Sequence, residues 1–187
     1  MLHGIREIRR LTKDIEKTKP KVYDEEGRVT VDISVSDDSD CLSPYSTANE
    51  PHISSDFADF LYHSVKHTHP NEKLHFKVKS DVISDTEKQI YPEAIKNYYT
   101  SEFIECSRDM RKNTFFSLIM TVLAALVFTV AIILEGVGVE SVVLSMIDVV
   151  AWVFMWEAVD LFVLERSAIK LKRARLLSLI RAKYSFN

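Results

Sequence analysis

The 21 residues from Thr114 to Leu134 include no charged side chain, and this stretch limits the fold more than any other feature of the chain. At about 1.5 Å per residue, a helix of this length crosses the roughly 30 Å hydrocarbon core of a bilayer. The core helix of a soluble protein normally keeps a polar face, and this stretch has none. The sequence therefore predicts a first transmembrane helix over residues 113–134.

A second apolar stretch covers residues 141–164 and is interrupted by three acidic residues, Asp148, Glu157 and Asp160. It is also long enough to cross a bilayer. Residues 135–140 (EGVGVE) lie between the two stretches and contain two glycines, which favour a turn. The two stretches are therefore expected to form a transmembrane hairpin with a short outer turn.

Basic residues flank the hairpin on both sides, while the turn has none. The positive-inside rule then places both termini in the cytoplasm. Residues 166–187 hold seven bases and no acid, so residues 165–187 are expected to form a basic cytosolic helix. Contact with anionic lipid headgroups is the simplest role for such bases, and binding to the acidic cytosolic domain is an alternative. The bases concerned are Arg166, Lys170, Lys172, Arg173 and Arg175.

Asp148 is the most informative residue in the predicted spans. It follows Ser141 by seven residues, which places it about 10 Å into the membrane. An ionised carboxylate at that depth is costly, so Asp148 is expected to be neutral, hydrogen-bonded or in a polar cavity. Thr129 lies at a similar depth in the first span and is the expected partner. Three interpretations stay open: a structural polar contact, an ion or proton pathway, or a shifted span.

Two further patterns concern contacts of the spans. Glu157 and Asp160 lie three residues apart near the inner surface, which favours interfacial anchoring or, in an oligomer, a cation-selecting ring. In the first span, small residues recur at intervals of four. They predict a face that packs within the hairpin, against the second span, or in an oligomer, and the lining of a cavity is the alternative. These residues are Ser117, Thr121, Ala125 and Thr129.

Residues 20–112 are expected to form a small cytosolic α/β domain that follows an amphipathic helix over residues 1–19. Apolar and polar residues alternate in Arg28–Ser36 and Glu72–Lys79, as in half-buried strands. A helix is expected after Ser54 or Ser55. Ser84 and Glu87 form a capping box that starts a long helix, which runs into the first span as a stalk. The predicted fold is thus an α+β membrane protein.

The soluble part offers few groups for catalysis. His63 and His67 lie four residues apart on the expected helix, with His69 nearby. They are interpreted either as surface histidines or as a metal-binding or pH-sensing cluster. The sequence contains no Gly-rich phosphate loop, nucleophile elbow or paired-cysteine motif, and no nucleic-acid module is recognisable. A non-enzymatic protein without a cofactor is therefore expected.

Four segments together resemble a group of small uncharacterised two-pass membrane proteins of Gram-positive gut bacteria. The segments are DDSDCLSPYS, PEAIKNYYTSEFI, DMRKN and WVFMWEAVDLF. The resemblance implies a bacterial plasma membrane and two spans, and it supplies no activity or site residues.

Two functions remain open at this point. The first is a non-enzymatic two-pass membrane protein whose cytosolic module recruits a partner or reports a ligand. A homo-oligomer, or a membrane or cytosolic protein partner, is expected. The second is an oligomeric ion channel or transporter subunit that uses Asp148.

Overall fold

The computed structural model of the chain describes residues 21–47 and 49–186. The chain forms two compact units. The sheet unit holds the residues up to Asn97 and those from Ser178 onward, and the hairpin unit is Tyr98–Leu177. The amphipathic helix predicted over residues 1–19 lies outside the described residues.

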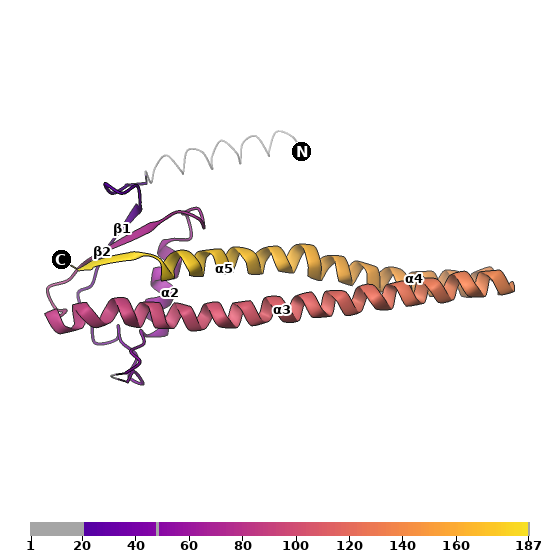
Figure 1. Ribbon diagram of the computed structural model, residues 1–187, viewed down its shortest axis with the longest axis horizontal. Coiled ribbons are helices and arrows are strands. Elements are labelled where there is room, and N and C mark those ends of the chain that lie inside the picture. The colour runs from indigo at the N-terminus through magenta and orange to yellow at the C-terminus, as the bar shows by residue number, and fades with distance from the viewer. Residues whose placement is uncertain (1–20, 48, 187) are drawn as a thin grey trace. The chain divides into compact units, whose positions relative to one another are not determined.

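The elements confirm the predicted combination of a small strand-containing unit with two long apolar helices (Figure 1). In chain order they are β1 (Val29–Ser34), α2 (Ser55–Ser64), β2 (Leu74–Lys79), α3 (Asp85–Val137), α4 (Ser141–Val159), the π-helix η1 (Asp160–Glu165), α5 (Arg166–Ile180) and β3 (Lys183–Phe186).

The sheet has three parallel strands in the order β1-β2-β3. The predicted basic helix over residues 165–187 is wrong at its end, because α5 stops at Ile180 and the chain continues as β3. Alternating Tyr184 and Phe186 explain this strand, since both side chains lie against the sheet unit's apolar interior: Tyr184 stacks on Phe76 and Phe186 packs near Tyr91. The whole hairpin unit is therefore the connection between two neighbouring strands.

The predicted alternation accounts for the apolar interior of the sheet unit, although His75 in β2 is also buried. In β2, Leu74, Phe76 and Val78 are buried, and Val29 and Ile33 are buried in β1. Helix α2 adds Ala58 and Leu61, and the first turns of α3 add Tyr91 and Ala94. Val78 and Tyr91 pack together in one apolar cluster with Cys41 and Ile83.

Side-chain caps fix where the helices of the sheet unit begin. The Ser54 hydroxyl accepts a hydrogen bond from the Phe57 amide at 3.3 Å and starts α2. At the start of α3, Glu87 accepts from the Ser84 amide at 2.9 Å, and the Glu87 amide donates to the Ser84 hydroxyl at 3.4 Å. The capping box is confirmed, and the hydrogen bond from Ser84 lowers the pKa of Glu87.

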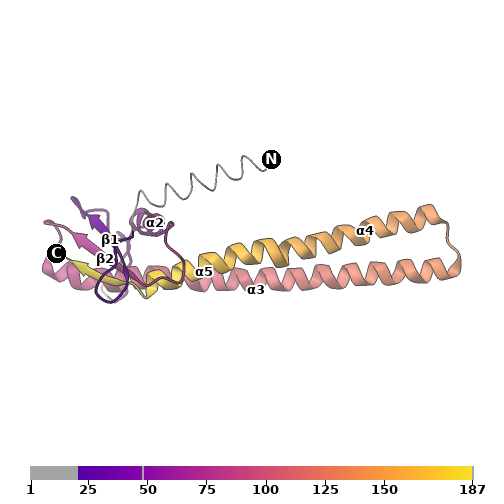
Figure 2. The same cartoon turned by 90° about the horizontal axis from the view of Figure 1, so that it is seen from above.

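In the hairpin unit, α3 lies side by side with α4 and α5 in both views (Figures 1 and 2). The turn is shorter than predicted, because α3 continues to Val137. Gly138 has φ 84°, its amide donates to the Glu135 carbonyl, and the Val139 amide donates to the Leu134 carbonyl. This pair of bonds is the Schellman motif, which ends a helix at a glycine.

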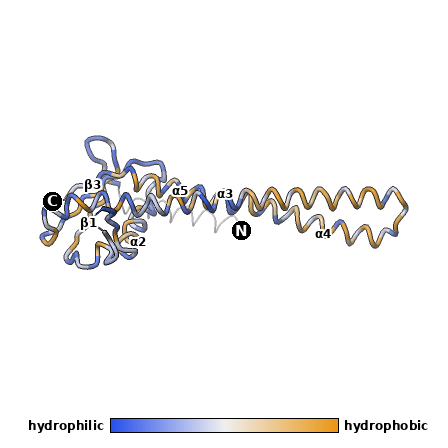
Figure 3. Tube along the Cα trace, turned by 60° about the horizontal axis from the view of Figure 1, so that its bottom comes forward, coloured by the Kyte–Doolittle hydropathy of each residue, from blue (hydrophilic) through white to orange (hydrophobic). Residues whose placement is uncertain are grey.

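Hydrophobic residues gather along α4 and the neighbouring part of α3, whereas the sheet unit and α5 are more hydrophilic (Figure 3). Only 17% of the most apolar stretch of α3 and 11% of that in residues 141–180 are buried. A core helix of a soluble protein is mostly buried, so the outer surface of this hairpin is unusual for a protein in water. Both helices are long and apolar enough to cross a membrane.

Candidate functional site

The contact between the two arms of the hairpin unit follows a heptad pattern. On α3 the inward residues are spaced alternately by four and three, as in a left-handed coiled coil. They are Cys106, Met110, Asn113, Ser117, Met120, Ala124, Val127 and Ala131. We call this line of contact between the two arms the seam. Its middle contains small residues such as Ala124, and its end nearest the basic residues of α5 is polar.

The opposite arm keeps the same pattern only up to Leu161. Its inward residues are Leu144, Ile147, Ala151, Phe154, Ala158 and Leu161, followed after a five-residue step by Arg166, Ile169, Arg173 and Leu176. The π-helix η1 supplies this extra residue, with the Arg166 amide donating to the Leu161 carbonyl. Such π-bulges often occur at functional sites. Here the bulge turns Arg166 and Arg173 toward α3 in place of Glu165 and Lys172.

Polar contacts join the two arms around the bulge. Asn113 is 6% exposed, and its Nδ2 atom donates to Glu165 at 2.7 Å. Ser117 donates to the Ala158 carbonyl at 3.2 Å. Cys106 donates from its thiol to the Ile169 carbonyl at 3.7 Å, and burial raises the pKa of this thiol, which keeps the donor protonated. The polar end of the seam is therefore held by hydrogen bonds.

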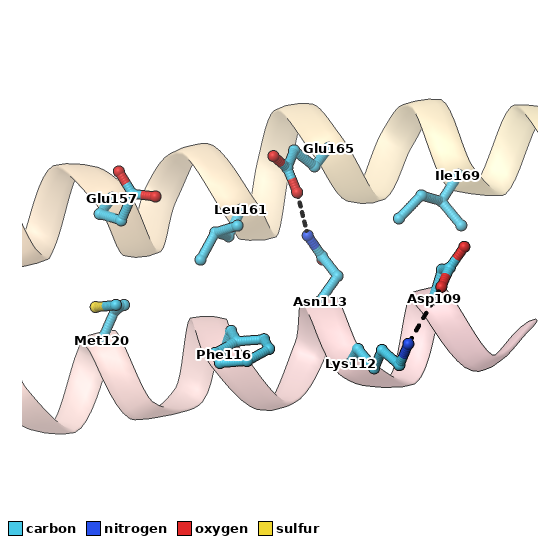
Figure 4. A pocket seen from close by; sticks show the side chains of 9 residues that line it. All are labelled: Asp109, Lys112, Asn113, Phe116, Met120, Glu157, Leu161, Glu165 and Ile169. Carbon is cyan, nitrogen blue, oxygen red and sulfur yellow. Dashed lines mark hydrogen bonds and ion pairs between the residues drawn. The ribbon is translucent and has the colours of Figure 1, made fainter. Parts of the chain in front are cut away.

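One flank of this end forms an acidic groove of about 370 Å³ (Figure 4). Its carboxylates come from Asp109, Glu157 and Glu165, and Asp109 is 3.9 Å from the Lys112 amine. The Asn113 Oδ1 atom is buried and has no hydrogen-bond partner in the described part of the chain. The remaining lining is apolar: Phe116, Met120, Leu161 and Ile169.

The other flank is basic. Arg111, Arg166 and Arg173 line a groove of about 470 Å³ with Met110, Phe115 and Leu118, and we call it the arginine groove. The guanidinium group of Arg173 lies 5.1 Å from the centre of the Phe103 ring, and its Nη1 donates to the Met110 sulfur at 2.9 Å. Arg166 lies 4.9 Å from the Phe162 ring centre. Aromatic and sulfur contacts thus hold two of the three guanidinium groups.

The sheet unit contains a separate hydrogen-bonded chain of three side chains. The Nδ1 atom of His75 lies 2.9 Å from Oδ2 of Asp24, and its Nε2 atom lies 3.0 Å from Oγ of Ser185. Donation from the Arg28 amide, and then from His75, lowers the pKa of Asp24.

These three side chains have the Asp-His-Ser order of hydrolase triads, but their geometry also serves a structural role. The Ser185 hydroxyl lies 3.4 Å from the Phe76 carbonyl oxygen, which can only accept a hydrogen bond. Tyr184 stacks on Phe76 with ring centres 5.2 Å apart. We interpret the chain as a tie that fixes β3 to β2 and to the turn at Asp24.

The structure does not bring Asp148 and Thr129 together. The Thr129 hydroxyl donates to the Ala125 carbonyl of its own helix at 2.8 Å. Asp148 is exposed on α4 and has no hydrogen bond or ion pair within the residues the structure describes. The predicted stripe of small residues is also displaced, because Thr121, Ala125 and Thr129 are exposed while Ser117, Ala124 and Ala131 are buried.

The other residues predicted for a site lie in different places in the structure. Glu157 lines the acidic groove, whereas Asp160 begins η1 and is not part of the lining. Arg166 and Arg173 are half-buried in the arginine groove, Lys170 and Lys172 are exposed, and Lys172 lies 3.6 Å from Glu102. Arg175 is half-buried on α5. The hydrogen-bonded pair Asn113 and Glu165 was not predicted from the sequence. Asn113 is polar and lies four positions before Ser117, so it continues the spacing of the predicted stripe and was a usable signal.

The expected helical spacing of His63 and His67 is wrong. Helix α2 ends at Ser64, and the following residues form turn bonds such as Thr68 amide to Val65 carbonyl ahead of Pro70. His63 bonds to the Asp59 carbonyl, and His69 accepts from the Asn71 amide. Within residues 21–47 and 49–186, no three His, Cys, Asp or Glu side chains are placed to hold a metal ion.

No family model matches the chain, and neither a curated protein nor a solved structure matches it. The resemblance to two-pass membrane proteins of Gram-positive bacteria therefore stays a prediction.

Proposed function

We propose that this chain is a non-enzymatic two-pass membrane protein of the plasma membrane, with the sheet unit and both termini in the cytoplasm. The sheet unit serves as a regulatory or partner-binding module, and the hairpin attaches it to the bilayer. The observation that carries the proposal is the apolar outer surface of α3 and α4, with Phe115 61%, Ile132 68% and Trp156 71% exposed. In water such a surface would drive aggregation, whereas lipid tails satisfy it.

The sheet supports a common side for the two ends of the hairpin, independently of the basic flanks. The residues on both sides of the hairpin unit belong to the same sheet unit, because β3 pairs with β2. A folded sheet cannot lie on both sides of a bilayer. If the hairpin crosses the membrane, its two ends therefore lie on the same side, and the charge rule assigns that side to the cytoplasm.

Membrane extraction and cysteine labelling test this proposal. Cys41 and Cys106 are buried, so they should react slowly and a single introduced cysteine can be read against a low background. We expect Glu140→Cys, in the turn, to react with a membrane-impermeant maleimide in intact cells. Glu25→Cys, on the sheet unit, is the matched control and should react only after permeabilisation. Labelling of Glu25→Cys in intact cells, or recovery of the chain in the soluble fraction, would overturn the proposal.

The exposure of Asp148 favours a second candidate, an oligomeric ion channel or transporter subunit. Its carboxyl lies on the outer side of α4, where a single hairpin in a bilayer would leave it toward lipid. A second copy would remove that cost, and several copies could enclose a path. Ion flux into liposomes separates the two functions, because Asp148→Asn should abolish the flux of a channel. A particle mass in detergent of one or two copies would count against a channel.

A further inference from the structure

The arginine groove carries positive charge without a matching carboxylate. Its three arginines form no ion pair within the part of the chain that the structure describes, whereas the nearby Lys112 and Lys172 do. Among the described residues, the Nε atoms of Arg166 and Arg173 also have no hydrogen-bond partner. Three guanidinium groups on one flank without an ion pair in the described chain favour an anionic ligand in this groove.

The shape of the lining indicates what kind of anion fits. Phe115 and Leu118 line the end of the groove that lies on the predicted first span, and each is 61% exposed. A second hollow of about 420 Å³ continues from Arg111 and Arg173 toward Phe103 and Ile104. A small free anion would leave the apolar end uncovered. A ligand with a charged head and an acyl chain would cover both parts.

Because the opposite flank carries the acidic groove, net positive charge gathers on only one side of the hairpin at this level. Carboxylates line one flank of the seam and guanidinium groups line the other, at the same level of the hairpin. A diffuse basic belt would attract anions from every side. Arginine forks also match phosphate oxygens better than lysine amines do, because they bond through two parallel N–H groups.

We propose that the arginine groove binds one anionic phospholipid, with Arg111, Arg166 and Arg173 around its phosphate and Phe115 and Leu118 along an acyl chain. This inference rests on the proposed membrane function. It goes further by naming a site, a ligand class and the arginines that recognise it, while Lys170 and Lys172 lie outside the groove.

Native mass spectrometry of the full chain in detergent tests this assignment. Phosphatidylglycerol and phosphatidylcholine with identical acyl chains serve as probes. We expect one retained phosphatidylglycerol per chain, and about tenfold weaker retention for the Arg166→Gln/Arg173→Gln variant. The matched control, Lys170→Gln/Lys172→Gln, removes the same charge from the same helix and should stay within twofold of the original chain.

Several results would overturn the inference. Equal losses in the two double variants would indicate only diffuse attraction, and equal retention of both lipids would exclude selection for net negative charge. Displacement by millimolar glycerol phosphate would show that a free phosphate is sufficient. A dimer that retains no lipid would indicate that the acidic flank of a second copy covers the groove.

Folding and membrane insertion are checked separately. The Arg166→Lys/Arg173→Lys variant keeps the charge but loses the forked geometry, and we expect an intermediate loss with unchanged helix content. If this variant retains lipid as well as the original chain, arginine geometry is not what recognises the phosphate. A chain that stays soluble without detergent would refute the proposed function itself, whereas a membrane-embedded chain without lipid selectivity would refute only the groove.

Discussion

The sheet unit and the apolar part of the hairpin unit bury opposite kinds of side chain. The sheet unit encloses large apolar residues such as Leu61, Phe76 and Tyr91. Between residues 113 and 164, the buried residues of the hairpin unit are small or polar, such as Asn113 and Ala124, and most of its large apolar residues there are exposed. In water the hydrophobic effect drives the first arrangement. In lipid that force between helices is absent, and close packing of small residues with hydrogen bonds takes its place.

The largest expected effect comes from removing a large core side chain of the sheet unit. Phe76 is fully buried and stacks on Tyr184, so Phe76→Ala should lower the free energy of unfolding by about 3–5 kcal/mol. Urea unfolding followed by near-ultraviolet circular dichroism of the detergent-solubilised chain measures this. Leu126→Ala is the control, because Leu126 is 57% exposed on the hairpin and should change stability by less than about 0.5 kcal/mol. Equal losses would contradict the comparison.

The second effect tests the small-residue seam. Ala124 is fully buried, and adding three carbons in Ala124→Leu should destabilise the hairpin by about 1–3 kcal/mol through overpacking. Ala125→Leu makes the same change one position away, where the side chain is exposed, and should have little effect. Thermal loss of helical circular dichroism in detergent separates the two. The four-residue stripe expected from sequence predicts the reverse order, so this pair decides between them.

These cases show which levels of structure the sequence could predict. The strands β1 and β2 and the Ser84–Glu87 capping box follow from local patterns and were correctly predicted. The cap of α2 was expected at Ser54 or Ser55, and the structure places it at Ser54. The two apolar helices follow from length and composition. Each of these depends on residues close in the chain, where propensity and periodicity act directly.

What the sequence did not predict depends on distant pairing. Strand β3 has only four residues, and its partner β2 lies about a hundred residues earlier. The π-helix shifts the seam by one residue and so decides which bases of α5 face α3, yet nothing in the local sequence marks it. The seven-residue spacing of Ser117, Ala124 and Ala131 was visible in the sequence. Residues repeated every four positions move away from the contact line between two helices within a few turns, whereas residues repeated every seven positions stay on it.

A smaller effect concerns the start of α3 in the sheet unit. Replacing Ser84 by alanine removes the hydroxyl that accepts from the Glu87 amide and should cost about 1 kcal/mol. The Ser167→Ala control removes a hydroxyl at the start of α5 that donates to the Leu164 carbonyl of η1, and it should cost only a few tenths of a kcal/mol. Urea midpoints at constant slope measure both. A loss confined to Ser167→Ala would show that the capping box does not stabilise the sheet unit.

The smallest effect depends on pH and concerns the tie that holds β3. The Asp24 pKa lies below its ordinary value of 3.8 in the folded chain, so this carboxylate stabilises the fold fully above that value. The contribution is lost as the pH falls through the lowered pKa, and Asp24→Asn should lack this acid-dependent loss. Amide hydrogen exchange of Lys183–Phe186, compared between variants at each pH, measures how firmly β3 is paired.

A second carboxylate provides the control for this experiment. Donation from the Ser39 amide lowers the pKa of Asp37 in the loop after β1, and Asp37 takes no part in the chain from Asp24 through His75 to Ser185. Asp37→Asn should therefore alter acid stability without loosening β3, whereas Asp24→Asn should increase exchange in β3 already near neutral pH. If both substitutions raise exchange in β3 equally, general charge effects hold the strand. If only Asp24→Asn does so, a polar tie complements the apolar core at the point where the hairpin returns to the sheet.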